Sequence, residues 1–104
     1  MGKWKRIEKY PDYIVSDFGE IQSIRPRTYL KKYIGKKGYY FVYIPVKDKF
    51  HYVYIHICVA EAFVTNFYFK RCVNHKDKNK LNNNSSNLEW VTHEENTFHW
   101  RHFR

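Results

Sequence analysis

The final third of the chain constrains the fold most, because four segments of different character follow one another there. Residues 71–75 and residues 88–91 are short segments with apolar side chains, and both predict strands. Residues 77–86 lie between them and are polar and rich in asparagine, which favours turns. Thr92 and Glu95 have the spacing of a capping box, which starts a helix. We therefore predict a strand, a loop, a second strand and a helix, in that order.

Short stretches with alternating side chains predict antiparallel strands in the first half of the chain, because one face of each strand packs on the core. Turns containing glycine, aspartate and lysine separate these strands. From His56 onward, the apolar residues Val59, Ala60 and Phe63 follow the spacing of one helical face, which predicts a helix of about two to three turns. The predicted strands cover residues 13–15, 20–24, 39–44 and 51–55.

The charge of the chain favours a polyanionic partner such as nucleic acid, because 19 Lys and Arg against 10 Asp and Glu give a net charge of +9. Residues 1–50 hold twelve Lys and Arg against five acids, whereas residues 51–104 hold seven against five. We consider two alternatives: a basic surface that serves only solubility, and an RNA-binding protein that stacks bases on its tyrosines. The predicted DNA-binding residues lie on or between the hairpins: Arg25, Arg27, Lys31, Lys32, Lys36 and Lys37.

The two cysteines, Cys58 and Cys72, are too few and too separated for a disulfide framework or a zinc site made of paired cysteines. We therefore expect an intracellular, reducing location, in the cytoplasm or in the nucleoid or nucleus of a host cell. Zinc is not expected even with His75 and His99 added to the cysteines, because zinc ligands normally come in tighter pairs. The chain shows no signal peptide and no apolar run long enough to span a bilayer, so no membrane partner is expected.

Three phrases in the second half resemble the HNH endonucleases, in the branch found among phage and intron homing enzymes. They are Asn74-His75-Lys76-Asp77, Asn87-Leu88-Glu89-Trp90 and Glu95-Asn96-Thr97. The segment from His56 to Phe63 resembles the helix that precedes the catalytic hairpin in that branch. The phrases Trp4-Lys5-x-Ile7, Tyr10-Pro11-x-Tyr13 and Gly19-x-Ile21-x-Ser23 resemble a small module often fused before the nuclease.

This resemblance implies an α+β fold, in which a small antiparallel β-hairpin module precedes a ββα-metal (HNH) catalytic motif. We place the N-terminal nuclease-associated module at residues 1–48 and the HNH nuclease domain at residues 49–104. The predicted function is a metal-dependent HNH DNA endonuclease of the homing type that hydrolyses phosphodiester bonds in double-stranded DNA and nicks a strand. The alternative is a catalytically weak or inactive DNA-binding relative of such a nuclease.

His75 is the predicted general base. Phosphodiester hydrolysis needs a group that takes a proton from water near neutral pH, and imidazole is the side chain whose ordinary pKa suits that task. The resemblance implies that Asn87, or the carbonyls of its loop, holds this imidazole in place.

Asn74 and Asn96 are the predicted ligands of one divalent cation, Mg²⁺ or Mn²⁺. Neighbouring strand residues point to opposite faces unless the strand is ending, where Asn74 and His75 can enter one pocket. Hard cations take oxygen ligands and keep several waters, so two amide oxygens and the substrate phosphate can suffice. Many relatives have aspartate at position 74 and glycine at the position of Lys78. Since an amide lacks the negative charge, we expect weak binding of the ion without DNA.

Other residues near these ligands are predicted to support the site. His99 follows Asn96 by three residues, which places it on a nearby helical face as a supporting residue or a phosphate donor. The same role is predicted for a cluster at the end of the chain. Asp77 is predicted to stabilise its turn rather than to bind the metal directly. The terminal cluster consists of Arg101, His102 and Arg104.

Overall fold

The N-terminal part of the computed structural model, which describes residues 2–102, is a four-stranded antiparallel sheet. Its strands follow one another in sequence order, and the register of β2 and β3 pairs Val15 with Ile21. Both side chains are buried, since they lie on the face that packs on the core. The strands are β1 (Trp4–Ile7), β2 (Tyr10–Ser16), β3 (Ile21–Ile24) and β4 (Arg27–Tyr29).

A second antiparallel sheet follows, with strand order β5 (Tyr33–Ile34), β6 (Tyr40–Val46) and β7 (Lys49–Tyr54). Alternate residues of β6 face opposite sides: Val42 and Ile44 are fully buried, whereas Tyr43 is exposed. The turn between β6 and β7 contains residue 48, where we placed the boundary between the two modules. Long strand pairing therefore joins the two sides of that boundary.

The last elements are α1 (Ile55–Phe63), the hairpin of β8 (Cys72–His75) and β9 (Leu88–Val91), and α2 (His93–His102). A short 3-10 helix, η1 (Ser85–Asn87), ends the long connection between β8 and β9. The predicted helix from His56 is confirmed as α1. The capping box is also confirmed: Thr92 N–H donates to Glu95 Oε1 at 2.8 Å, and Glu95 N–H donates to Thr92 Oγ1 at 3.1 Å.

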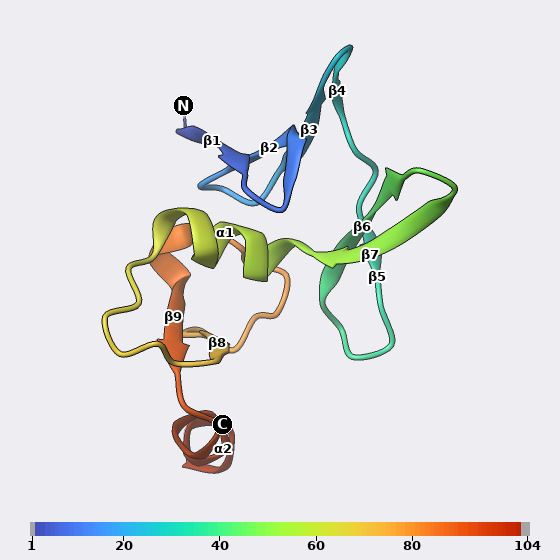
Figure 1. The fold of residues 1–104 in the computed structure, drawn as a ribbon. Coiled ribbons are helices and arrows are strands. Elements are labelled where there is room, and N and C mark those ends of the chain that lie inside the picture. Colours follow the sequence, from blue (N-terminus) through green and yellow to red (C-terminus); the bar gives the residue numbers. More distant parts are fainter. Residues whose placement is uncertain (1, 103–104) are drawn as a thin grey trace.

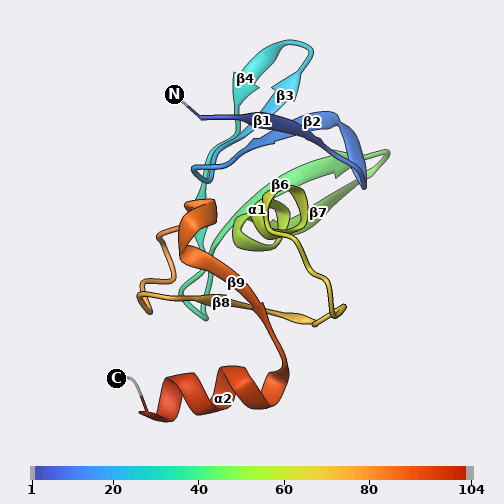
Figure 2. The ribbon, with the colours of Figure 1, turned by 90° about the vertical axis from the view of Figure 1, so that its left-hand side faces the viewer.

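Helix α1 lies at the centre of the molecule. Figures 1 and 2 show the four-stranded sheet on one side of α1 and the β8–β9 hairpin on the other, with α2 beyond that hairpin. One hydrophobic cluster joins these layers, because Val59 and Ala60 of α1 are fully buried together with Ile21 of β3 and Leu88 of β9. The two modules therefore share one core. The α+β fold with antiparallel hairpins and a terminal ββα unit agrees with the sequence prediction.

The sequence prediction missed β1, β4 and β5, which are short or lie at the edge of a sheet. Four, three and two residues give too few alternations for a period to be recognised. None of the helices among residues 2–102 is long and apolar enough to cross a membrane.

Candidate active site

His75 is the last residue of β8, and its side chain is only 2% exposed. Its Nε2 lies 2.8 Å from Oδ1 of Asn83, which belongs to the connection between β8 and β9. An amide oxygen only accepts hydrogen bonds, so Nε2 carries the hydrogen and Nδ1 carries the lone pair. Among residues 2–102, the hydrogen bonding of the His75 ring is through Nε2, which leaves the lone pair of Nδ1 available. This tautomer is the one that a general base requires.

Two aromatic rings pack beside the imidazole. Tyr39 stacks on His56 with ring centroids 4.5 Å apart and on His75 at 5.8 Å, and the His56 and His75 rings are 5.2 Å apart. Burial lowers the pKa of His75; the hydrogen bond that the ring donates to Asn83 and the charge of Asp77 oppose this decrease. Burial also lowers the pKa of His56 to about 4, and His75 adds to that decrease. Both imidazoles are therefore neutral at neutral pH.

Asn87 organises the loop between β8 and β9. Its Nδ2 donates to Asp77 Oδ1 and to the carbonyl of Asn82, both at 2.9 Å, and its Oδ1 accepts from the backbone N–H of Asp77 at 3.1 Å. Its own carbonyl accepts from the N–H of Lys76 at 2.8 Å. We predicted that Asn87 or the carbonyls of its loop hold the imidazole. In the structure the contact to the ring comes instead from the side chain of Asn83, and the side chain of Asn87 fixes the path of the loop.

Asp77 lies inside this network. Its carboxylate accepts hydrogen bonds from the N–H of Asn79 at 2.8 Å, from Nδ2 of Asn82 at 2.9 Å and from Asn87. These hydrogen bonds, with that of Asn82 the largest, lower the pKa of Asp77. The carboxylate of Asp77 accepts hydrogen bonds from three donors of its own loop, which is the arrangement expected of a residue that stabilises a turn.

Lys78 has φ of 63°, in the left-handed region that favours glycine. This backbone conformation is consistent with the glycine that the resemblance led us to expect at this position. The lysine adopts it, and its Nζ lies 5.8 Å from the centre of the Trp100 ring in α2. Lys78 thus has the left-handed backbone conformation of the turn, and its side chain connects this loop to α2.

The N-terminal module touches the loop that holds the imidazole. Gly19, with φ of 92°, packs so closely on Asn83 that an added Cβ would lie 2.9 Å from the Cβ of Asn83. The backbone carbonyl of Asp17 accepts from the N–H of Ser85 at 2.7 Å. The position of Asn83, and through it that of His75, therefore depends on the turn between β2 and β3.

Asn74 and Asn96 each have a buried amide oxygen. Asn74 is 2% exposed and precedes His75 in β8, while Asn96 lies in the first turn of α2, which contacts β8. Oδ1 of each is buried and makes no hydrogen bond with any residue between Gly2 and His102. Unpaired buried carbonyl oxygens are costly unless a ligand satisfies them, and amide oxygens suit a hard divalent cation. These two residues therefore fit the predicted metal ligands.

The described residues contain no group of three or more His, Cys, Asp and Glu that could hold a metal ion. Burial raises the pKa of Cys58 to about 12, so its thiol is protonated at neutral pH and is a poor ligand for zinc. His99 lies in α2 beside Trp100, with ring centroids 6.1 Å apart. Of the predicted terminal cluster, Arg101 is exposed, whereas Arg104 and the side chain of His102 lie outside the described residues.

The predicted DNA-binding residues lie in the two sheets and in the segments that join them, and five of them are exposed and take part in no ion pair among the described residues. Lys32 differs, because its Nζ forms an ion pair with Glu20 at 2.9 Å. Arg27 is exposed but donates to Gln22 at 2.7 Å, which fixes its direction. The four whose exposed side chains make no hydrogen bond or ion pair with another described residue are Arg25, Lys31, Lys36 and Lys37.

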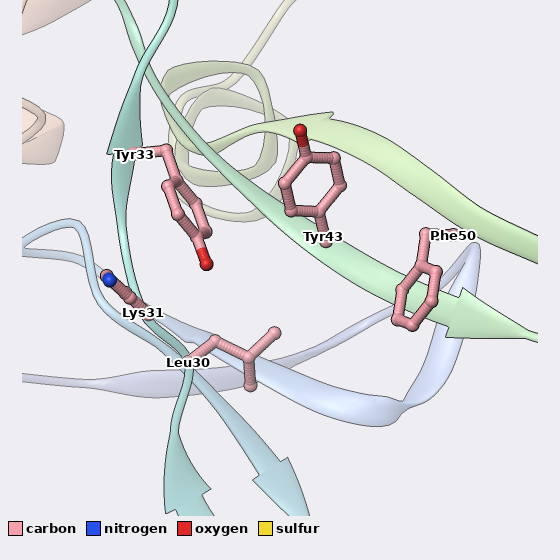
Figure 3. Close-up of a pocket in the computed structure, with 5 residues that line it drawn as sticks. All are labelled: Leu30, Lys31, Tyr33, Tyr43 and Phe50. Carbon is pink, nitrogen blue, oxygen red and sulfur yellow. The ribbon is translucent and has the colours of Figure 1, made fainter.

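Lys31 also lines an aromatic cavity of about 390 Å³ between the two sheets. Figure 3 shows the rings of Tyr33, Tyr43 and Phe50 around this space, with Leu30 at its floor. The Nζ of Lys31 lies 5.2 Å from the centre of the Tyr33 ring. A cation therefore stands beside exposed rings on the basic half of the chain.

Comparison with known proteins identifies both halves of this arrangement. A family model described as HNH endonuclease matches residues 53–98, which include α1, the hairpin and most of α2. A second model, the NUMOD4 motif, matches residues 3–44. This chain belongs to the HNH endonucleases. The matched HNH segment contains His75, Asn83, Asn74 and Asn96, so the geometry and the family assignment concern the same residues.

HNH proteins of phages and of a giant virus are similar to nearly the whole chain. DNA endonuclease I-HmuI of Bacillus phage SP01 is 40% identical over 91 residues, which cover 86% of this chain and 52% of the relative. The uncharacterized HNH endonuclease L245 of Acanthamoeba polyphaga mimivirus is 39% identical over 97 residues, which cover 93% of this chain and 29% of the relative. This HNH chain thus spans about half of the length of I-HmuI and less of L245.

A solved structure confirms the fold of this HNH chain. The structure described as "DNA binding and cleavage by the HNH homing endonuclease I-HmuI" superposes with a TM-score of 0.87 at 37% sequence identity. The match covers 95% of this chain and 57% of the other. Both the N-terminal module and the ββα unit are therefore arranged as in that phage enzyme.

Sequence reasoning missed three residues that the structure brings to the imidazole: Asn83, Tyr39 and His56. Asn83 is one of several similar asparagines, and no spacing rule separates it from Asn82 or Asn84. His56 carried a usable signal, since a histidine at the start of an apolar helix is buried on the face toward the core. Tyr39 is brought to the site by the second sheet, and sequence distance gives no indication of that contact.

Proposed function

We propose that this chain is a metal-dependent HNH endonuclease of the homing type that hydrolyses phosphodiester bonds in double-stranded DNA and nicks one strand. The observation that carries the proposal is the imidazole of His75, which is held by Asn83 in the tautomer whose Nδ1 is the base. His75 belongs to β8, which also carries Asn74, and β8 contacts α2, which carries Asn96. The activity of I-HmuI, a DNA endonuclease by name, supports the assignment.

His75 takes the proton of the attacking water on Nδ1 in this proposal. Burial lowers its pKa, so the ring is in its basic form at neutral pH. The hydrogen bond from Nε2 to Asn83 keeps the ring oriented and stabilises the imidazolium that forms. The charge of Asp77 also favours that imidazolium.

Asn74 and Asn96 would hold the divalent cation, Mg²⁺ or Mn²⁺, through their buried Oδ1 atoms. Bound there, the ion would stabilise negative charge on the phosphate and on the departing oxygen. Asn74 directly precedes His75 in β8, and α2, which carries Asn96, contacts β8; this supports a site in which water, phosphate and base would meet near the end of β8.

The basic first half would hold the duplex through its phosphates, in a manner that depends on salt concentration. Arg25, Lys31, Lys36 and Lys37 are the residues that would make these contacts, since Lys32 and Arg27 are engaged with other side chains. The enzyme would act inside a cell, where its DNA substrate is found.

One observation favours the alternative, a DNA-binding relative with little or no activity. Both proposed metal ligands are neutral amides, which bind a divalent cation more weakly than carboxylates do. Such a protein would retain duplex DNA in a salt-sensitive way and would leave it uncut.

The test is a plasmid-nicking assay combined with a gel shift on the same preparation. With Mg²⁺ or Mn²⁺, the wild-type chain should convert supercoiled plasmid to the relaxed form, and His75→Ala should lower the rate by about 100-fold or more while it still binds DNA. His93→Ala is the matched control, because His93 is exposed at the start of α2. Equal rates of cutting by wild type and His75→Ala would show that His75 is not the general base. Binding without cutting by the wild type would favour the alternative.

A further inference from the structure

The two ends of the Asn74 amide have different environments. Nδ2 donates to Oε2 of Glu89 at 2.7 Å. The two residues are direct partners in the antiparallel pair of β8 and β9, so the backbone register brings their side chains together. Oδ1 is buried and has no partner within the described range of residues. The protein thus fixes the NH₂ end of this amide, and the oxygen end is available to a bound ligand.

Glu89 decides which end is which. An ionised carboxylate only accepts hydrogen bonds, so the amide of Asn74 must turn its NH₂ group toward Glu89. The oxygen then faces the other way. Without this acceptor, rotation of the amide by a half-turn would exchange the two ends at little cost in shape, and an NH₂ group cannot ligate a cation. The cross-strand pair therefore presets Asn74 as an oxygen donor.

Glu89 also supplies a charge that the two amide ligands lack. Asn74 and Asn96 are neutral, and the carboxylate of Glu89 is separated from Oδ1 of Asn74 only by the amide group itself. Attraction between opposite charges at such short range is strong where burial keeps water away. Glu89 is half-buried and is not engaged in any ion pair of the described part of the structure.

We propose that Glu89 is a positioning residue of a divalent-cation site formed by Asn74 and Asn96: it fixes the Asn74 amide with its oxygen toward the ion and provides the negative charge. This inference rests on the proposed function, because that function requires the ion. It adds a residue from β9, which none of the predicted roles included. The residue acts through Asn74 and does not touch the reacting atoms.

The experiment measures Mn²⁺ binding by electron paramagnetic resonance, with the metal ion alone titrated to millimolar concentrations, and thermal unfolding in the presence of EDTA. The variants are Glu89→Gln, Asn74→Asp and the double variant Asn74→Asp/Glu89→Gln. Glu8→Gln is the matched control, because it removes one exposed carboxylate from the turn between β1 and β2. Binding and unfolding are read without cleavage, so the result does not depend on turnover.

Glu89→Gln should weaken Mn²⁺ binding at least about tenfold, because glutamine has no charge and can present either end of its amide. Glu8→Gln should stay within about twofold of the wild type. Asn74→Asp alone should lower the melting temperature in EDTA, since it sets two carboxylates against each other. The double variant should recover both the melting temperature and most of the Mn²⁺ affinity, because it exchanges the amide and the carboxylate between the two strands.

Three results would contradict the inference, and they can be distinguished. Mn²⁺ binding by Glu89→Gln that equals wild-type binding would overturn the role of Glu89 and leave the proposed function intact. Absence of Mn²⁺ binding by the wild-type chain at millimolar metal would overturn this inference, whereas the proposed function is decided separately by the plasmid-nicking assay, in which the DNA phosphate is present. A double variant whose melting temperature in EDTA is as low as that of Asn74→Asp would also contradict the inference, because it would show that the amide and the carboxylate cannot be exchanged between positions 74 and 89.

Discussion

The two halves of the molecule differ in the kind of side chain that each one buries. From β1 to β7, the buried side chains are mostly apolar, such as Val15, Ile21 and Ile44, and they come from strands with alternating faces. Beyond α1, the buried side chains of the described chain are mostly polar: Leu88 and Val91 are the apolar ones, against His75 and three asparagines. A hairpin with so few apolar residues cannot provide its own core. The three buried asparagines are Asn74, Asn83 and Asn87.

This difference shows where the site obtains its rigidity. The loop between β8 and β9 is fixed locally by hydrogen bonds between asparagine side chains and the backbone, as at Asn87. It is fixed globally by contacts with the first half, at Gly19 on Asn83 and at Lys37, whose carbonyl accepts from Nζ of Lys80 at 2.9 Å. The basic first half of the chain therefore also supports the loop that contacts His75.

The largest effect is expected at the shared core. Ile55 begins α1 and is fully buried between the two halves. Ile55→Ala should lower the free energy of unfolding by about 2–5 kcal/mol, because it removes apolar contacts and leaves a cavity. Urea unfolding followed by NMR should show amide signals from β2 and from β9 disappearing in one transition. Ile34→Ala, at a site that is 59% exposed, should cost about 0.5 kcal/mol or less. Separate transitions would show that the two halves fold independently.

The second expected effect concerns pH. His56 has a folded-state pKa of about 4, against an ordinary value of 6.5 in the unfolded chain. Between these two values the unfolded chain binds a proton that the folded chain does not, so the free energy of unfolding decreases as the pH falls from 6.5 to about 4. The decrease from this one group is at most about 3 kcal/mol. Urea unfolding at several pH values measures it.

His56→Phe keeps a ring next to Tyr39 but cannot be protonated, so the slope of stability against pH should become smaller in this variant. The burial of His75 should account for part of the slope that remains. A slope that is unchanged in His56→Phe would mean that His56 does not carry this dependence. His93→Gln, at an exposed position, is the control and should keep the wild-type slope.

The third effect tests the contact between the two halves. Gly19→Ala and Gly38→Ala both place a side chain at positive φ, 92° and 89°, and this conformation alone costs about 1–2 kcal/mol. Only at Gly19 would the new Cβ lie 2.9 Å from the Cβ of Asn83; at Gly38 the nearest atom is the end of a lysine side chain at 3.4 Å. Gly19→Ala should therefore lower the nicking rate about tenfold or more, and Gly38→Ala about twofold. Equal nicking rates in the two variants would show that the contact of Gly19 with Asn83 does not help to position His75.

The smallest effect concerns the basic surface. Lys36→Ala should reduce the salt dependence of DNA binding by about one unit of slope, because it removes one phosphate contact. Lys32→Ala should reduce it less, since Glu20 already neutralises Lys32 through a 2.9 Å ion pair. Fluorescence anisotropy with a duplex at several salt concentrations gives both slopes. A larger change for Lys32 than for Lys36 would contradict this assignment of the surface.

Sequence reasoning predicted the regular elements well where a segment is long enough to show a period. The helix from His56, the strand that ends at His75 and the capping box at Thr92 follow from local spacing, and the structure confirms all three. The short strands β4 and β5 were missed because pairing with a neighbour, rather than their own side chains, makes them strands. The candidate site shows the same difference between local patterns, which the sequence reveals, and long-range contacts, which it does not. Local motifs indicated Asn74, His75 and Asn96, and contacts over long sequence distances brought Tyr39 to the imidazole.

The order of residues alone determined the α+β fold, the basic character of the first half and the candidate base, because periodicity, charge and side-chain chemistry are local properties. Only the tertiary structure decided which asparagine holds the imidazole and which carboxylate faces Asn74. Several asparagines of the loop are chemically equivalent, and Glu89 lies fifteen residues from Asn74. The packing of Gly19 on Asn83 and the register of β8 against β9 select one partner in each case.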